Sequence, residues 1–119
     1  MIPVAPAPEP NHFDARVRQK GLDAIAELVG EDPTRRRKGP KRKKIVNSRA
    51  EIPSEAFPPF WREVLPEMLV SYHRVCAYLA LYIEHATGSP SVDHVVPKSK
   101  AWDRVYEWSN YRLACSLIN

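Results

Sequence analysis

A run of basic residues constrains the fold of this 119-residue chain more than any other feature of its sequence. Nine Lys or Arg residues and no acidic residue lie between positions 35 and 49. Like charges at this density repel one another and stay in solvent, so the stretch cannot enter a core. The sequence therefore predicts a flexible basic linker over residues 31–52, which either only connects folded parts or also contacts phosphate groups. The residues expected to make such contacts are Arg35, Arg36, Arg37, Lys41, Arg42, Lys43 and Lys44.

The charge of the remaining chain is nearly balanced. The whole sequence has 18 basic and 14 acidic residues, a net charge of +4, and the basic and acidic residues cancel between positions 60 and 119. The apolar stretch Val75–Ile83 is too short to span a bilayer, and the N-terminus lacks the basic-then-apolar pattern of a secretory signal. We therefore expect no membrane partner, a cytoplasmic location and reduced cysteines.

The N-terminal part is expected to contain one helix. Residues 1–12 are rich in proline and should be extended. Residues 13–30 have the pattern of a short amphipathic helix, in which Asp14 is placed to cap the first turn and Gly30 to end the last. Such a helix docks either on the rest of the chain or on a protein partner. Its predicted apolar stripe consists of Val17, Leu22, Ile25, Ala26 and Val29.

The rest of the chain combines helical and strand patterns, which predicts an α+β fold. Apolar residues recur at helical spacing over residues 60–72, where Pro66 would kink a helix or divide it into two pieces. The stretch Val75–Ile83 is continuously apolar and contains Tyr, Val and Ile, which favours a strand that enters a turn. Short strands are also expected around residues 91–96 and from Tyr111 onward, with a long loop between them.

The polar residues with the clearest chemical potential lie near these last two strands. Asp93 and His94 are followed by two apolar residues and Pro97. Asn110 lies 16 residues after His94, and Asn119 lies nine residues further on. Taken singly, an Asp-His pair is most often part of a surface turn, and each asparagine is most simply a turn residue or a chain end. The joint spacing is what favours a functional site.

In these residues the sequence resembles the HNH (ββα-metal) endonucleases, over positions 74–119. VDHVVPKSK is similar to the first strand and loop of that family, YEWSNYRLAC to its central asparagine segment, and LIN to the start of its helix. The resemblance implies an HNH-like nuclease domain over residues 53–119 that hydrolyses DNA phosphodiester bonds, in a setting such as phage defence or a mobile element.

The resemblance also implies a role for each motif residue. His94 would be the general base that takes a proton from the attacking water. Asp93 and Asn119 would supply oxygen ligands to one divalent cation, Mg²⁺ or Mn²⁺. Asn110 would hold the loop by hydrogen bonds to its backbone.

Four further basic residues flank this site. They would contact DNA phosphates, or else they are ordinary surface charges. Two other classes of function stay open: a nucleic-acid-binding protein on an inactive nuclease scaffold, and a protein-interaction module that docks through the 14–29 helix. The four residues are Lys98, Lys100, Arg104 and Arg112.

The sequence departs from the family pattern at two places. Many HNH proteins bind a structural zinc through two Cys-x-x-Cys pairs, but here Cys76 and Cys115 are followed by Leu79 and Ile118 at the second positions. Two thiolates do not complete a four-ligand site, so we expect no structural zinc. The last motif residue of the family lies on a helix, and the sequence ends on Asn119. We therefore expect a unit that lacks most of its final helix and cleaves weakly or not at all.

Overall fold

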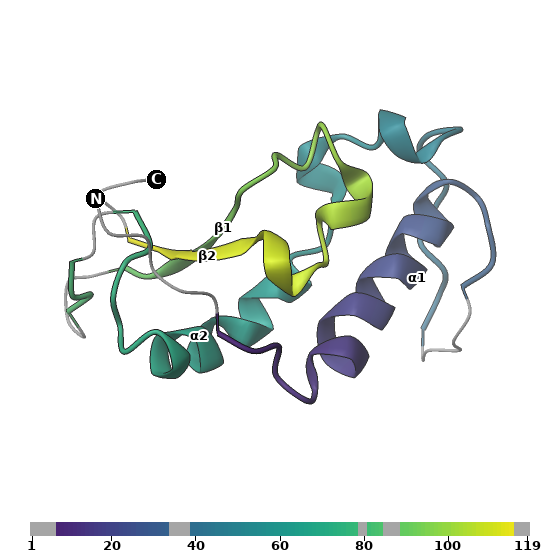
Figure 1. The fold of residues 1–119 in the computed structure, drawn as a ribbon. Helices are drawn as coiled ribbons and strands as arrows, with labels where there is room; N and C mark the ends of the chain where they lie inside the picture. Colours follow the sequence, from purple (N-terminus) through teal and green to yellow (C-terminus); the bar gives the residue numbers. More distant parts are fainter. Residues whose placement is uncertain (1–6, 34–38, 79–80, 85–88, 116–119) are drawn as a thin grey trace.

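The computed structural model describes residues 7–33, 39–78, 81–84 and 89–115, which form an α+β fold (Figure 1). The described helices are α1 (Gln19–Leu28) and α2 (Leu65–Ser71), and the strands are β1 (Ser91–His94) and β2 (Tyr111–Ala114). In Figure 1, α2 lies beneath the strands and α1 lies beside the loop that joins them. Short helical turns are formed by Asp14–Arg18, Arg49–Glu51, Ser54–Ala56, Phe60–Val64, Trp102–Arg104 and Trp108–Asn110.

The predicted N-terminal helix is present, but it does not begin as expected. A π-helical turn, Asp14–Arg18, runs directly into α1. The helix cap is Phe13, and Asp14 lies inside the first turn, where its carboxylate accepts hydrogen bonds from Arg18 and Gln19. The prediction that Asp14 caps the helix is therefore wrong. Gly30 follows the helix with a φ of +86°, a left-handed conformation that glycine adopts without strain.

The predicted apolar stripe is confirmed at Val17, Ile25 and Val29, which are buried, but not at Leu22. Leu22 was expected in the core and is 40% exposed. Gly21 allows the ring of Tyr106 to lie directly against the helix backbone, so the face that contains Gly21, Ile25 and Leu28 is the buried one. The helix therefore docks on the core of its own chain.

We expect Gly21→Ala to destabilise the fold, although alanine favours helices. A Cβ at position 21 would lie 2.1 Å from Cγ of Tyr106, whose ring is buried and whose hydroxyl donates to Pro58 O at 2.7 Å. Adding a methyl group to a filled core lowers the free energy of unfolding by about 1–3 kcal/mol, and a contact this short should give a loss near the upper end of that range. The gain in helix propensity is about 1 kcal/mol, so the net loss of unfolding free energy should be about 2 kcal/mol.

Urea denaturation measures this loss. The matched control is Arg16→Ala, because Arg16 is exposed in the same helical region and should change the stability by less than about 0.5 kcal/mol. A Gly21→Ala chain as stable as the wild type would contradict the packing of Tyr106 on α1.

The described part of the basic tract lies along α1. Ile45 N donates to Leu28 O at 2.9 Å. The backbone N–H of Arg42 and its guanidinium both donate to the carboxylate of Glu27, which is buried in the helix. Residues 42–46 are therefore in contact with the helix that precedes them.

The second helical region consists of two pieces, as Pro66 suggested. A 3-10 turn, Phe60–Val64, leads into α2. Pro66 lies in the first turn of α2, where its missing N–H removes no helical hydrogen bond. Met68 on the same helix is fully buried and joins α2 to the core.

The prediction of one strand over Val75–Ile83 is wrong. The segment folds back on itself, and Cys76 N donates to Leu81 O at 2.8 Å. His73 and Arg74 precede it with φ values of 51° and 59°, which turn the chain into this small hairpin. A continuously apolar run has no periodicity, so the reversal could not be read from its pattern.

The two predicted C-terminal strands are both present and pair in an antiparallel register. Asp93 lies opposite Arg112, and His94 lies opposite Tyr111. Phe13 supports β2 from the N-terminal segment, since its ring packs edge-on against Tyr111 at 5.8 Å between centroids. Among the described residues, no helix has the length and apolarity needed to cross a bilayer.

Candidate active site

His94, the last residue of β1, lies in an aromatic pocket. The centroid of its ring lies 4.7 Å from that of Trp61 and 5.2 Å from that of Tyr111, both in edge-on arrangements. Its Nε2 lies 3.0 Å from the carbonyl oxygen of Val105. A carbonyl oxygen only accepts, so Nε2 carries the proton of the neutral ring and Nδ1 carries the lone pair. The arrangement therefore makes Nδ1 the basic nitrogen.

The carbonyl oxygen of Val105 accepts two hydrogen bonds. Besides His94 Nε2, it accepts a hydrogen bond from the hydroxyl of Tyr111 at 2.8 Å. Burial raises the pKa of Tyr111 far above its ordinary value, so the hydroxyl remains a donor. Val105 directly follows the turn Trp102–Arg104, and its side chain is fully buried. The loop between the strands thus fixes the orientation of the His94 ring.

The pKa of His94 lies below its ordinary value of 6.5. The largest cause is burial of the ring, which disfavours the charged form. The hydrogen bond to Val105 O acts in the opposite direction, and the nearby ammonium of Lys98 lowers the pKa further. His94 is therefore neutral at neutral pH, the state in which an imidazole accepts a proton.

We expect this lowered pKa to make the metal-free fold less stable in acid. In the unfolded chain the pKa of His94 returns to about 6.5. Between the lowered folded value and the unfolded value, the unfolded chain binds more protons, so the free energy of unfolding rises with pH across that window. Thermal denaturation in EDTA from about pH 5 to about pH 8 measures the rise. In His94→Gln, the part of the rise in unfolding free energy that comes from His94 should be absent. A pH dependence of stability that is unchanged in this variant would contradict the burial of His94.

Asp93 precedes His94 in β1 and offers one carboxylate oxygen. Its Oδ2 accepts a hydrogen bond from the hydroxyl of Tyr78. Its charge also acts on the His94 ring, whose pKa it raises slightly. Among the described residues, Oδ1 accepts no hydrogen bond. Within the described part of the chain, the carboxylate is therefore held at Oδ2 alone.

The donor chemistry of Asp93 suits a hard divalent cation. Among the described residues, no group of three or more His, Cys, Asp or Glu side chains is arranged so that it could hold a metal ion. Mg²⁺ keeps several waters and is bound through one or two carboxylates together with substrate phosphates, so it needs no such cluster. Asn119, the second expected ligand, lies outside the described residues. One carboxylate oxygen with an amide oxygen and waters is a set that Mg²⁺ or Mn²⁺ accepts.

Asn110 ties together the two ends of the loop between the strands. Its Oδ1 accepts from Val96 N at 2.8 Å, and its Nδ2 donates to Val96 O at 3.2 Å and to Arg104 O at 3.1 Å. Its backbone oxygen accepts from Val95 N at 2.9 Å. The side chain is 3% exposed. Asn110 therefore holds the backbone on both sides of the loop that presents Val105 O to His94.

The flanking basic residues differ in their surroundings. The ammonium of Lys98 lies 4.7 Å from the ring centroid of Trp61, the residue that borders His94. Lys100 and Arg104 are exposed. The guanidinium of Arg112 donates to the carbonyl oxygens of Ser109 and Tyr111, at 2.9 and 2.8 Å. Lys98 is thus the flanking residue whose charge acts directly on His94.

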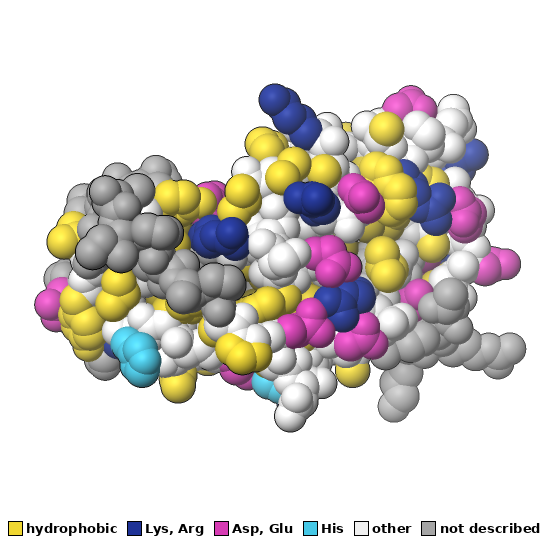
Figure 2. All heavy atoms as spheres, viewed as in Figure 1, with side chains coloured by type: hydrophobic (Ala, Val, Ile, Leu, Met, Phe, Trp, Pro, Cys, Tyr) yellow, Lys and Arg dark blue, Asp and Glu magenta, His cyan; other side chains and the backbone are white. Residues whose placement is uncertain are grey.

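The predicted phosphate-binding residues of the basic tract are only partly available. Lys41 forms an ion pair with Asp32, and Arg42 forms one with Glu27. On the face seen in Figure 2, basic side chains are separated by acidic and hydrophobic ones. Within the described part of the tract, Lys43 and Lys44 are exposed, whereas Arg35, Arg36 and Arg37 lie outside the described residues.

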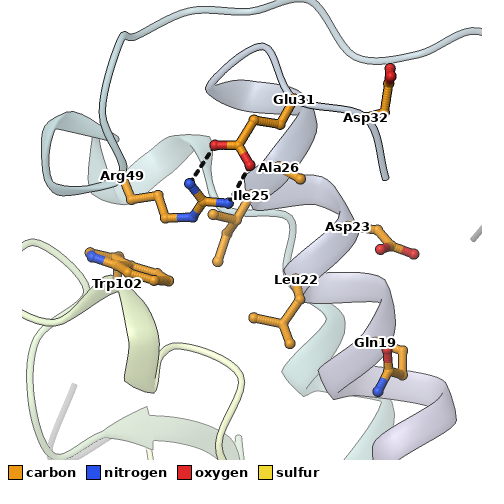
Figure 3. Close-up of a pocket in the computed structure, with 9 residues that line it drawn as sticks. All are labelled: Gln19, Leu22, Asp23, Ile25, Ala26, Glu31, Asp32, Arg49 and Trp102. Atoms are coloured by element: carbon orange, nitrogen blue, oxygen red, sulfur yellow. Dashed lines mark hydrogen bonds and ion pairs between the residues drawn. The ribbon is translucent and has the colours of Figure 1, made fainter. Parts of the chain in front are cut away.

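A groove of about 330 Å³ lies between α1 and Trp102 (Figure 3). Arg49 lies over the ring of Trp102 at 5.4 Å, and its guanidinium is bound by both oxygens of Glu31. The residues that line the groove include three acidic ones, Asp23, Glu31 and Asp32, and one basic one, Arg49, a balance that disfavours phosphate. A DNA backbone is therefore not expected in this groove.

Cys76 and Cys115 are both buried in the hydrophobic core and are not joined by a disulfide. The residues that stand at the second positions of the two pairs, Leu79 and Ile118, lie outside the described residues.

Sequence reasoning missed three residues that shape the site. Trp61 belongs to no motif segment, and its ring borders His94. Val105 contributes through its backbone carbonyl, for which a sequence carries no signal. Tyr78 lies in the segment that was expected to be a strand. Comparison with protein-family models, with curated proteins and with solved structures returned no match, so the site is interpreted from its own geometry.

Proposed function

We propose that this chain is a metal-dependent endonuclease of the HNH type that hydrolyses DNA phosphodiester bonds. The observation that carries the proposal is the hydrogen bond between His94 Nε2 and Val105 O. It leaves Nδ1 as the basic nitrogen of a ring whose lowered pKa keeps it neutral. The antiparallel β1–β2 pair and the hydrogen bonds of Asn110 add support, since the HNH resemblance implies both.

His94 would act as the general base. Its Nδ1 takes a proton from a water, and the oxygen of that water forms a bond to phosphorus while the bond from phosphorus to the 3′ oxygen breaks. The 3′ oxygen then takes up a proton from solvent. Val105 O holds the ring and accepts from Nε2 while the imidazole is charged, in the way that an orienting acceptor supports a catalytic histidine. The products carry a 5′-phosphate and a 3′-hydroxyl.

Asp93 and Asn119 would hold the divalent cation through oxygen atoms. Mg²⁺ or Mn²⁺ bound there would supply positive charge to the scissile phosphate and to the leaving 3′ oxygen.

Lys98 would hold the phosphate that lies at His94, because its ammonium lies over Trp61 beside that ring. Lys100 and Arg104 are exposed on the same loop and would contact neighbouring phosphates. Lys43 and Lys44 would add affinity from the basic tract. Contacts of this kind carry no sequence information, so cleavage should show little base specificity.

A labelled duplex tests this proposal. With protein in excess, Mg²⁺ or Mn²⁺ should produce cuts with 5′-phosphate and 3′-hydroxyl ends, and EDTA should stop them. Cleavage that continues in EDTA, or ends with a 3′-phosphate, would contradict metal-assisted hydrolysis by water.

A further inference from the structure

We propose that Tyr78 is a positioning residue for the metal site. Its hydroxyl holds one oxygen of the Asp93 carboxylate and so turns the other oxygen toward the divalent cation. This inference rests on the proposed function, since it adds a residue to the same site. Tyr78 belongs to none of the motif segments that carry the HNH resemblance.

The hydrogen bond itself is the first observation. The Tyr78 hydroxyl donates to Oδ2 of Asp93, 15 residues further along the chain, in a partly buried setting. An aspartate side chain rotates about its bonds unless something holds it. Mg²⁺ requires near-ideal octahedral geometry, so a ligand held in one orientation binds it better than a rotating one. With Oδ2 engaged, Asp93 presents Oδ1 alone.

The second observation is that the backbone beside Tyr78 is attached to the sheet. Ala77 N donates to the carbonyl oxygen of Leu113 in β2 at 2.8 Å. Cys76 N donates to Leu81 O at 2.8 Å, and its side chain is fully buried. These bonds place Tyr78 next to β2, from which its side chain reaches the Asp93 carboxylate on β1. A residue supported in this way can hold a ligand in place.

Direct measurement of metal binding tests whether Tyr78 positions the Asp93 carboxylate or only supports the fold. Mn²⁺ titration followed by electron paramagnetic resonance gives the affinity without any cleavage. Tyr78→Phe should bind Mn²⁺ about 10-fold more weakly, the lower end of the effect of removing a hydrogen-bond partner from a metal ligand. Tyr106→Phe is the matched control, because its hydroxyl donates to Pro58 O and not to Asp93, and it should bind as the wild type does.

A Tyr78→Phe chain that keeps wild-type affinity, while Asp93→Ala loses it, overturns the role of Tyr78 and leaves the nuclease proposal standing. Wild-type chain that binds Mn²⁺ no better than Asp93→Ala overturns the metal site and, with it, both proposals.

A measurement on the unmutated chain covers the case in which Tyr78→Phe fails to fold. With carbon-13-labelled tyrosine and aspartate, the ring carbon that bears the Tyr78 hydroxyl should shift during a Mg²⁺ titration with the same midpoint as the Asp93 carboxyl carbon. The corresponding carbon of Tyr106 should not shift. A Tyr78 signal that ignores Mg²⁺ while the Asp93 signal moves would overturn the inference.

Discussion

His94→Ala is expected to lower the single-turnover rate of DNA cleavage by at least about 100-fold, the usual contribution of a general base. The variant removes the nitrogen that would take the proton from water, and it leaves the basic residues of the loop and the tract in place. Its affinity for DNA should therefore stay unchanged. The ratio of the two rates is informative even if the wild-type chain cuts slowly.

The measurement needs both cleavage and binding from the same preparations. Rates are taken with protein in excess over a labelled duplex, affinities in EDTA, and folding is checked by circular dichroism. His73→Asn serves as the control, because His73 is exposed and asparagine tolerates its positive φ. If His94→Ala cuts as fast as the control, His94 is not the base. If it loses DNA affinity as much as rate, its role is binding.

Asn110→Ala is expected to lower the free energy of unfolding by about 3 kcal/mol. The change removes three hydrogen bonds, to Val96 N, Val96 O and Arg104 O, from a side chain that is buried. Each buried backbone group left without a partner costs about 1–3 kcal/mol, and some of the three would regain water as the loop relaxes. Few substitutions of surface residues lower the free energy of unfolding by as much as this.

Chemical denaturation of Asn110→Ala against Asn47→Ala measures this effect, since Asn47 is exposed in the basic tract. Because the same loop carries Val105, cleavage by Asn110→Ala should fall as well. A loss of less than about 1 kcal/mol, equal to one ordinary hydrogen bond, would contradict the role of Asn110 as the residue that holds the loop.

Local sequence patterns predicted the secondary structure correctly where the conformational properties of a single residue type determine it. Gly30 ends the N-terminal helix because its φ is positive. Pro66 separates two helical pieces because it has no N–H to donate. The two C-terminal strands were expected around residues 91–96 and from Tyr111 onward, and they bring Asp93 and His94 opposite β2. The α+β fold could therefore be predicted.

Features that depend on tertiary contacts could not be predicted in this way. Leu22 has the correct spacing for a core residue, but the ring of Tyr106 on Gly21 rotates the buried face of α1 away from it. The apolar run Val75–Ile83 pairs with itself, a choice that depends on the turn before it. These are cases in which packing overrides a weak local preference.

The candidate site also contains residues that sequence patterns predict and residues that only the tertiary structure reveals. The motif spacing singled out His94, Asp93 and Asn110, whose proposed roles depend on the chemistry of their side chains. The groups that orient them were not identified in this way. Val105 acts through a backbone carbonyl that every residue possesses, and Tyr78 is an ordinary half-buried tyrosine until its hydroxyl is seen at Asp93.

The central claim, that His94 and Asp93 form a metal-dependent nuclease site, is tested most directly by relaxation of a supercoiled plasmid. Wild-type protein, His94→Ala and Asp93→Ala are each incubated with Mg²⁺ or with EDTA, and nicked product is measured over time. We predict nicking by the wild type with Mg²⁺, none in EDTA, and a strongly reduced rate in both variants. Equal nicking by all three proteins, or nicking by the wild type that is as fast in EDTA as with Mg²⁺, would contradict the account.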